Sequence, residues 1–407
     1  MLMVINMNIL KRFFIRSYQK IMYVASFVLS FKEPIIIKGE NSFESLAKLL
    51  KTYKKQNVLL VTDNTLHNLK MDEKVYQYFI DENINYTLYY NVDANPTIDQ
   101  VEEGVKTYLS NKCDCIVVIG GGSPIDCAKV IGARVSNPKR SIKKMKGLLK
   151  VRKRLPLLIA IPTTAGTGSE ATLAAVISNP NTKEKFPIED SKLIPSYAIL
   201  NPKLLINLPD KITSTTGMDA YTHAIEAYIG KANTTKTKQS AVLAIQLVNK
   251  YLYVSYKEPE NLLAREKMQE ASYHAGVAFT RAYVGYVHAI AHTLGGFYHV
   301  PHGLANAIIL PKVLRLYGKN VHKKLAELYD VIHINNSLTI ETKANLFIEE
   351  IEKLNESLNI PNNLRGIIKE NDIDLMIKRA MEESIPLYPT PEIWDYEKFK
   401  IIFEELM

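Results

Sequence analysis

The order of apolar and polar positions divides the chain into two unlike parts. Between residue 35 and about residue 205, β-rich apolar runs alternate with amphipathic segments; the runs are "NVLLVTD" ending at Asp63, "CIVVIGGG" ending at Gly122 and "LPLLIAIPTT" ending at Thr164. This alternation predicts an open α/β sheet. Beyond about residue 210, long segments such as 240–254 and 343–358 follow a helical period. The second part is therefore predicted to be all-helical.

A chain of 407 residues is longer than one average domain. We expect an N-terminal basic and apolar extension over 1–32, an α/β dinucleotide-binding domain over 33–205 and an all-helical metal-binding domain over 206–407. The chain shows no internal repeat and no Gly/Ser-rich linker. A cleft between the two domains is the expected place for a ligand.

The first 32 residues carry five side-chain charges, all positive, at Lys11, Arg12, Arg16, Lys20 and Lys32. The apolar run that follows Lys20, from Ile21 to Phe31, has 11 residues and is too short to span a bilayer. A packed or amphipathic helix is the first interpretation. Peripheral attachment to a membrane and a signal peptide are alternatives, although "VLSFKEP" offers a poor cleavage site.

The net charge of +9 is concentrated locally, because residues 139–154 hold nine basic side chains and no acid. Aromatic residues do not alternate with these charges as they do in a nucleic-acid groove, so no nucleic-acid partner is expected. A solvated excursion between two elements is the first interpretation, and docking of an acidic partner is the alternative. The three cysteines, Cys113, Cys115 and Cys127, lie too close together for a disulfide framework and suit buried positions in a cytoplasmic protein.

A phosphate site is predicted where the second apolar run ends. A buried strand leads into Gly120, Gly121 and Gly122, and Ser123 and Pro124 then suit the N-cap and the first position of a helix. Glycines allow close approach of phosphate oxygens, and the helix start favours an anion. A tight strand-to-helix turn without a ligand is the structural alternative.

Two further strand ends suit a nucleotide cofactor whose phosphates bind at this turn. Asp63 could accept the ribose hydroxyls and repel a 2′-phosphate, which favours NAD over NADP; its alternative is to cap the turn "TDNT". The segment 161–172, "IPTTAGTGSEAT", offers hydroxyls and backbone amides to a pyrophosphate or a carboxamide. On a parallel sheet these ends line one edge.

A metal site is predicted in the second part. Asp219 and His223 stand four apart on a helical segment, so both project from one face. A second segment, "VHAIAHTLGGFYHVPHGLANA", holds four of the nine histidines: His288, His292, His299 and His302. One carboxylate and three imidazoles suit zinc or iron(II) and leave room for a substrate oxygen. Spacing alone leaves open which three histidines bind.

Together, "GGGSPIDCAK", "IPTTAGTGSEAT", "GMDAYTHAIEAY" and "VHAIAHTLGGFYHVPHGLANA" closely resemble the signature segments of the iron-containing, or group III, alcohol dehydrogenases. The resemblance runs from about residue 35 to the C-terminal region. It implies a metal-dependent oxidoreductase that transfers a hydride between NAD(H) and a small primary alcohol or aldehyde. A cytoplasmic homodimer is expected.

The resemblance also assigns residues. It implies that the metal ligands are Asp219, His223, His288 and His302, and that His292 lies near the nicotinamide and substrate, as a proton relay or positioning group or as a structural residue. His299 is expected to line the pocket or the surface. The implied cofactor contacts are Asp63, Asn95, Gly121, Gly122, Ser123, Thr163, Thr164, Gly166, Thr167 and Lys185. Tyr221 and Thr293 depart from the frequent residues and are expected to reshape the substrate pocket.

Other activities remain possible on this reasoning. A polyol or glycerol-type dehydrogenase, or a lyase like dehydroquinate synthase that uses NAD transiently, would share the architecture. A protein of another class, a non-catalytic scaffold that binds nucleotide or metal, would bind NADH without turnover. Net consumption of NADH with simple aldehydes separates the dehydrogenase from the lyase and from the scaffold.

Overall fold

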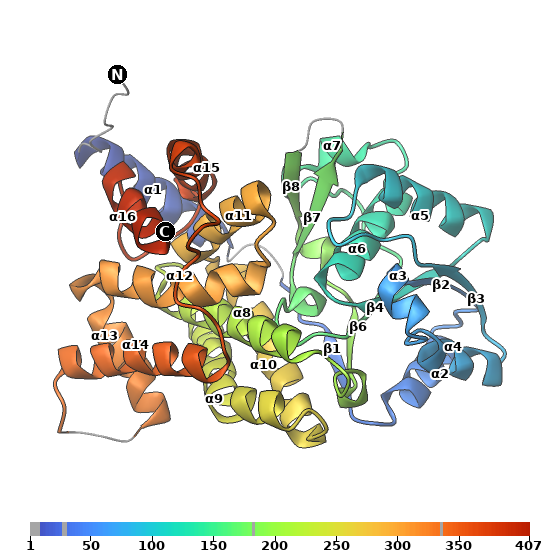
Figure 1. Cartoon of the computed structure of the whole chain (residues 1–407). Helices are drawn as coiled ribbons and strands as arrows, with labels where there is room; N and C mark the ends of the chain where they lie inside the picture. Colours follow the sequence, from blue (N-terminus) through green and yellow to red (C-terminus); the bar gives the residue numbers. More distant parts are fainter. Residues whose placement is uncertain (1–8, 27–30, 181–183, 334–336) are drawn as a thin grey trace. The chain divides into compact units, whose positions relative to one another are not determined.

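The computed structural model describes residues 9–26, 31–180, 184–333 and 337–407. The chain packs into two compact units (Figure 1). The α/β unit comprises residues 30–208 and 259–276, and the helical unit comprises residues 1–29, 209–258 and 277–407. One long helix, α10 (Leu262–Ala282), contributes residues to both units.

The α/β unit is built on a six-stranded, fully parallel sheet with the order β1-β9-β6-β4-β2-β3. Its strands are β1 (Ile35–Lys38), β2 (Asn57–Val61), β3 (Asn85–Tyr89), β4 (Cys115–Gly120), β6 (Leu157–Pro162) and β9 (Tyr197–Leu200). The chain passes from β2 outward to β3 and then returns to the other side of β2 to form β4. This reversal creates a switch point at the carboxyl ends of β2 and β4, where open α/β sheets bind ligands.

Helices lie on both faces of this sheet (Figure 1). They are α2 (Ser42–Thr52), α3 (Asn64–Asn68), α4 (Glu73–Asp81), α5 (Ile98–Ser110) and α6 (Gly122–Ser136). Alternate residues of the central strands, such as Leu59, Ile116 and Leu158, point into one core with α5 and α6. Because both faces are covered, the central strands are apolar at successive positions.

A smaller sheet completes the α/β unit. It has the order β5-β8-β7, with β5 (Gly147–Leu148), β7 (Ala174–Asn179) and β8 (Glu184–Glu189). Short 3₁₀ turns lie at Ser169–Ala171, Ser191–Leu193 and Pro202–Leu204. The basic stretch 139–154 includes the four-residue helix α7 (Ile142–Met145) and β5. Lys139, Lys143, Lys144 and Lys150 are exposed there, as expected of a solvated excursion.

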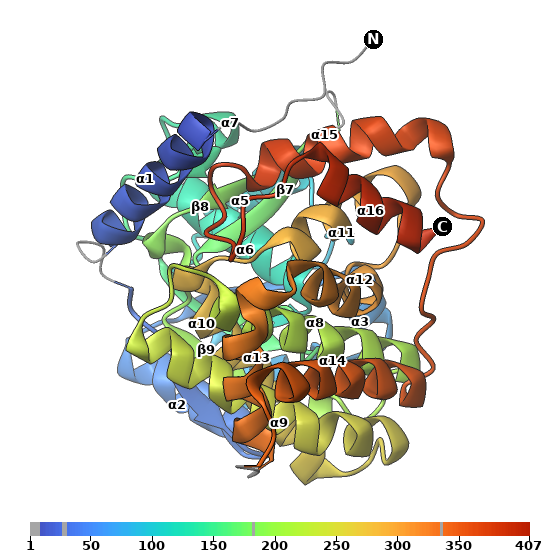
Figure 2. The same ribbon diagram turned by 90° about the vertical axis from the view of Figure 1, so that its left-hand side faces the viewer.

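The helical unit contains the remaining helices of the described residues. They are α1 (Ile9–Ser26), α8 (Asp210–Ile229), α9 (Thr235–Lys257), α11 (Tyr286–Tyr298), α12 (His302–Tyr317), α13 (Lys319–Ile332), α14 (Ile340–Ser357), α15 (Ile373–Ser384) and α16 (Tyr396–Leu406). A 3₁₀ turn, Glu370–Asp372, precedes α15. Helix α8 packs against both α9 and α12 (Figure 2). Most of its side chains are buried. Polar side chains on such a helix need partners or ligands.

The predicted fold class, a parallel α/β part followed by a helical part, is confirmed. The three cysteines are free and buried, as predicted. The predicted N-terminal helix is present as α1, whereas residues 1–8 and 27–30 of the expected extension lie outside the described residues. In the described part of the chain, no helix combines the length and the apolar character needed to cross a membrane.

One local prediction is wrong. Helix α6 begins at Gly122 with Gly121 as its N-cap, two residues earlier than the expected cap at Ser123. The hydroxyl of Ser123 instead donates to the carbonyl of Ala94 at 2.6 Å. No side chain caps the helix, so its start presents backbone N–H groups without a competing side-chain acceptor.

Candidate metal centre and cofactor site

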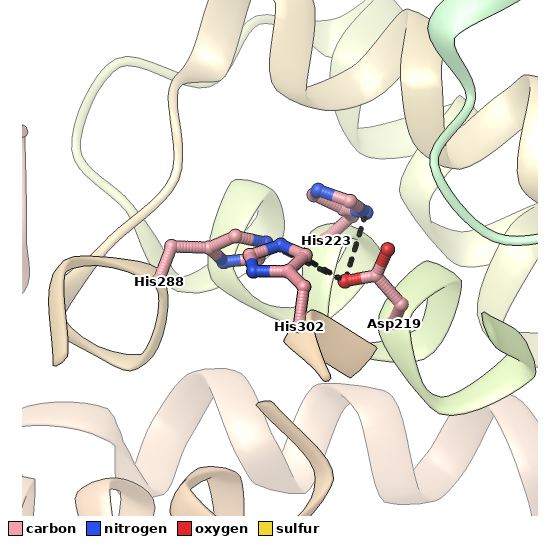
Figure 3. Close-up of side chains that lie close together, drawn as sticks. All are labelled: Asp219, His223, His288 and His302. Carbon is pink, nitrogen blue, oxygen red and sulfur yellow. Dashed lines mark ion pairs between the residues drawn. The ribbon is translucent and has the colours of Figure 1, made fainter. Parts of the chain in front are cut away.

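Three helices of the helical unit bring the four predicted ligands together (Figure 3). Helix α8 carries Asp219 and His223, α11 carries His288, and α12 begins at His302. Their donor atoms all lie within 4.8 Å of one another. Measured from Asp219 Oδ1, the nearest imidazole nitrogens are His302 Nε2 at 3.4 Å, His288 Nε2 at 3.8 Å and His223 Nδ1 at 4.0 Å.

The cluster is closed on one side and open on the other. Asp219, His223 and His288 are buried, and the ring of His223 is stacked between Phe279 and the ring of His288, at centroid distances of 4.1 and 4.3 Å. The side chain of His302 is 38% exposed. His302 is therefore the most exposed of the four residues.

Burial favours the neutral form of His288 and His302. It holds the pKa of His288 well below its ordinary value, and the neighbouring imidazoles lower that pKa further. Burial also lowers the pKa of His302 to about 4, although the carboxylate of Asp219 opposes this shift. A neutral imidazole has one nitrogen with a free lone pair, which is the form that binds a metal ion.

Glu226 orients His288 and was not predicted from the sequence. One carboxylate oxygen lies 2.6 Å from His288 Nδ1 and accepts the N–H of Gly285, and the other accepts the N–H of Val287 at 2.8 Å. Burial raises the pKa of Glu226 to about 7, against the lowering effect of these N–H groups. With Nδ1 engaged, His288 presents Nε2 to the cluster, which is the usual arrangement behind a metal-binding histidine.

Asn306 is a second residue that the sequence analysis missed. Its amide nitrogen, Nδ2, donates to Asp219 Oδ1 at 2.7 Å and lies 3.2 Å from His288 Nε2 and 3.1 Å from His302 Nε2. The side chain is fully buried. Helical spacing could have identified both missed residues, since Glu226 follows Asp219 by seven positions and Asn306 follows His302 by four.

Two glycines allow the helices that carry the ligands to approach one another closely. A Cβ on Gly303 would lie 2.2 Å from the carbonyl oxygen of Thr215, which is on α8. A Cβ on Gly285 would lie 2.6 Å from Glu226 Oε1. Both glycines therefore hold the histidine-bearing segments against α8.

His292 lies beside the cluster but outside it. Its ring is stacked on that of His302 at 5.1 Å, and its side chain is 43% exposed. His292 Nδ1 lies 2.7 Å from Glu383 Oε1, which also accepts the hydroxyl of Tyr388. Burial, the largest single effect, raises the pKa of Glu383, but His292, the hydroxyl of Tyr388 and His302 together outweigh it, so the net pKa is lowered. His292 is thus held by a carboxylate next to the open side of the cluster.

His299, and the two residues that depart from the family pattern, Tyr221 and Thr293, take ordinary structural positions. His299 ends α11 in a left-handed conformation and is exposed, which agrees with the surface alternative. The expected pocket-shaping role of Tyr221 and Thr293 finds no support, because both side chains are buried in helix packing. The hydroxyl of Tyr221 accepts from Asn249, and that of Thr293 donates to the carbonyl of Ile290.

In the α/β unit, the predicted cofactor residues meet at the carboxyl edge of the sheet. Because β2, β4 and β6 are parallel neighbours, Asp63, the turn at Gly121 and the loop that starts at Thr163 follow adjacent strand ends. Thr163 donates its N–H to the carbonyl of Gly120 at 3.0 Å, and a Cβ on Gly122 would lie 3.2 Å from Thr167. Gly122 is therefore confined between its own turn and that loop.

The remaining predicted residues flank this edge. Lys185, on β8, donates to Asn95 Oδ1 at 2.6 Å, and burial lowers the pKa of its amine. The segment just before Asn95 also accepts the hydroxyl of Ser123. Asp63 caps α3 by accepting the N–H of Leu66 at 2.9 Å. The capping alternative for Asp63 is thus realised, and a carboxylate that accepts one bond retains further acceptor capacity.

A buried lysine bonds to the end of the hydroxyl-rich loop 161–172 and to the strand that follows it. Lys129, on α6, donates to Ser169 Oγ, Thr172 Oγ1 and the carbonyl of Ala174 at 2.8 to 3.1 Å. Glu170 is buried beside it, and burial raises the pKa of that carboxyl to about 7. This network ties the end of the loop to the helix that begins at the glycine turn.

Comparison with known proteins now decides the family. Residues 34–202 match the family described as iron-containing alcohol dehydrogenase, and residues 213–407 match the C-terminal part of the Fe-containing alcohol dehydrogenase family. The chain belongs to the iron-containing alcohol dehydrogenases. The matches begin at residue 34, so α1 precedes the part of the chain that this family shares.

Relatives in this family cover nearly the whole chain. The NAD-dependent methanol dehydrogenase of Bacillus methanolicus is 36% identical over 87% of this chain and 93% of its own. The 1,3-propanediol dehydrogenase of Citrobacter freundii is 37% identical over 85% of this chain and 90% of its own. The solved structure of an alcohol dehydrogenase from Oenococcus oeni superposes with a TM-score of 0.88, at 33% identity over 93% of this chain and 100% of its own.

Proposed function

We propose that this protein is an NAD(H)-dependent oxidoreductase that interconverts small primary alcohols, diols included, and their aldehydes with the help of one divalent metal ion. The observation that carries the proposal is the group formed by Asp219, His223, His288 and His302, with all donor atoms within 4.8 Å. Membership of the alcohol dehydrogenase family gives that group its chemistry, and relatives named for methanol and 1,3-propanediol indicate the size of the substrate.

The residues present fit a divalent ion such as iron(II) or zinc. One carboxylate oxygen and three imidazole nitrogens form a donor set typical of both ions. The lowered pKa values of His288 and His302 leave these imidazoles neutral, and Glu226 directs Nε2 of His288 toward the cluster. When bound, the ion supplies a Lewis acid that polarises the alcohol or aldehyde oxygen.

The chain's own residues then orient the substrate and manage its proton. The buried side of the cluster, with Phe279 behind His223, keeps water away from the donor atoms. The substrate oxygen approaches from the exposed side, past His302. There His292, held by Glu383, is placed to accept the hydroxyl proton at its ring nitrogen Nε2 and pass it to solvent.

The cofactor is assigned to the carboxyl edge of the parallel sheet. The uncapped start of α6 binds the pyrophosphate through backbone N–H groups. Thr163, Thr164, Gly166 and Thr167 supply hydroxyls and amides from the adjacent loop, and Asn95 and Lys185 line the opposite side. NAD supplies the two-electron acceptor for the hydride. Asp63, at the end of β2, is assigned to the ribose hydroxyls and disfavours NADPH.

The decisive experiment is an NADH-oxidation panel over short aldehydes, hydroxy-aldehydes and semialdehydes, run on apo-protein reconstituted separately with iron(II) and zinc. Net NADH oxidation is expected with at least one ion. His288→Ala should lose both metal and turnover, whereas His322→Ala, a histidine on α13 outside the cluster, should retain both. If the wild-type protein binds metal stoichiometrically and NADH tightly but oxidises NADH with no aldehyde of the panel, it is a non-catalytic scaffold instead.

The preference for NAD has its own test. Replacement of Asp63 by Gly removes the carboxylate that would repel a 2′-phosphate, so the ratio of kcat/KM for NADH over NADPH should fall by roughly tenfold or more. An unchanged ratio would mean that Asp63 acts only as the cap of α3.

We further propose that the protein is a cytoplasmic homodimer. The thiols of Cys113, Cys115 and Cys127 are all free and buried, which suits a reducing compartment. Strand β1 is an outer strand of the large sheet, and Ile35 on it is 59% exposed, so this edge can pair with a second copy. The mass in solution, measured by light scattering, tests the dimer.

A further inference from the structure

Helix α1 is fixed to the helical unit by one face only. Gln19 donates from Nε2 to the carbonyls of Pro386 and Tyr388 at 3.0 and 2.7 Å. Arg16 donates to the carbonyls of Thr390 and Pro391, and Ile15 is buried against Ile393. These contacts set the rotation of the helix about its axis. In Figure 1 it lies along the outer side of the helical unit.

The opposite face of α1 is apolar and exposed. Five large apolar side chains on this face form what we call the outer stripe, with the exposed fractions Leu10 77%, Phe13 71%, Phe14 69%, Ile21 67% and Val24 59%. Ser17, which is partly exposed, lies between its two halves. A surface helix of a globular protein ordinarily turns such a stripe to the core. Here hydrogen bonds hold the other side of the helix against the helical unit, so the apolar side faces outward and can contact an apolar environment outside the chain.

The charge of α1 indicates which apolar environment its exposed side contacts. The helix carries Lys11, Arg12, Arg16 and Lys20 and no acidic residue. Lys20 is exposed and, by helical spacing, lies beside Phe13 and Val24 of the outer stripe. On the anchored side, Asp395 pairs with Arg12 at 3.9 Å. The exposed side thus combines large apolar side chains with positive charge.

We propose that α1 docks the protein on an anionic membrane surface, with the outer stripe in the headgroup and acyl boundary and Lys11 and Lys20 against lipid phosphates. A second copy of the chain is the less favourable occupant, because a two-fold contact through the stripe would bring the same lysines of both copies together. A bilayer with anionic lipids supplies an apolar layer and a negative surface at once. This proposal does not depend on the proposed activity, because α1 precedes the family match and carries none of the proposed ligands.

Co-sedimentation of the full chain with vesicles tests the docking. The wild type should bind vesicles that contain phosphatidylglycerol, bind pure phosphatidylcholine vesicles weakly, and lose most of the binding as salt is raised. The double change Phe13→Ser with Phe14→Ser should weaken binding roughly tenfold or more, and Lys11→Glu with Lys20→Glu should do the same. Leu109→Ser, which removes a 59% exposed leucine on α5, is the matched control and should bind like the wild type.

Three results would overturn the proposal. The wild type could fail to bind anionic vesicles at low salt. The phenylalanine variant, shown to be folded by an unchanged thermal unfolding midpoint, could bind as well as the wild type. The wild type could be an oligomer that does not bind vesicles, and the phenylalanine variant a monomer. That result would make the outer stripe an interface between copies of the chain.

Discussion

Replacing Glu226 by Gln tests whether this buried carboxylate sets the metal affinity through His288. The carboxylate serves three donors, namely His288 Nδ1 at 2.6 Å and the N–H groups of Gly285 at 2.9 Å and Val287 at 2.8 Å. Glutamine has almost the same shape, but one of its two end groups is an NH₂ donor. If the amide oxygen stays with His288, the NH₂ group faces the N–H of Val287 and one buried donor is left unpaired.

The magnitude follows from this geometry. An unpaired buried N–H costs about 1 to 3 kcal/mol of unfolding free energy. The imidazole of His288 also exchanges a carboxylate partner for a weaker amide oxygen. Loss of such a partner lowers metal affinity by about 10- to 100-fold, which corresponds to about 1.4 to 2.8 kcal/mol.

The assay is a competition titration of apo-protein with zinc and a chelator of known affinity, combined with urea unfolding of the apo form. Glu226→Gln should raise the Kd for zinc by about 10- to 100-fold and lower the apo stability by about 1 to 3 kcal/mol. Glu327→Gln is the matched control, because Glu327 accepts the hydroxyl of Tyr228 in the same unit and contacts no ligand. An unchanged Kd in a folded Glu226→Gln protein would refute the reasoning.

Three further predictions use the same two measurements. Gly303→Ala should raise the zinc Kd by roughly tenfold and lower the stability by about 1 to 3 kcal/mol, because the added Cβ forces α12 away from α8. Gly296→Ala is the control and should change neither quantity, because a Cβ at Gly296 has no atom within 4 Å. Equal behaviour of the two variants would contradict this. Asn306→Leu, which removes the donor to Asp219 at similar volume, should weaken zinc binding by roughly tenfold, and wild-type affinity would show that the amide is dispensable. Burial raises the pKa of Glu170 from 4.5 to about 7, so the folded state keeps a proton that the unfolded chain releases. The apo stability of the wild type minus that of Glu170→Gln should therefore fall by up to about 3 kcal/mol between pH 4.5 and 7. Glu226, whose pKa is also raised to about 7, contributes to both proteins and cancels in this difference. A difference that does not change with pH would contradict this assignment to Glu170.

Much of the fold could be predicted because its signals are local. Parallel strands covered on both faces are apolar at every position, as in the run from Cys115 to Gly120, and long helices keep a visible period. The start of α6 was placed two residues late, because Ser123 and Pro124 are favourable at a cap and at a first turn but the chain enters the helix at Gly122. The bond from Ser123 to Ala94 joins residues 29 positions apart, and no local pattern reports such a bond.

The candidate site divides in the same way. Spacing on one helix placed Asp219 beside His223, but it could not choose among His288, His292, His299 and His302. Resemblance to the family chose His288 and His302, and the structure places both within the cluster, with His292 stacked outside it. Helical spacing puts Glu226 near the face of Asp219 and Asn306 near that of His302, but the sequence does not show that Glu226 bonds to His288 or that Asn306 bonds to Asp219.

The sequence by itself determined the two kinds of architecture, the glycine turn after a buried strand and the set of side chains able to hold a metal, because each depends on residues close together in the chain. Only the tertiary structure decided which of them act together. Bonds such as that between Glu226 and His288 join residues 62 positions apart, and the approach of Gly303 to Thr215 depends on two helices packing without a Cβ between them. Contacts of this kind depend on packing across the whole unit, and no sequence window contains them.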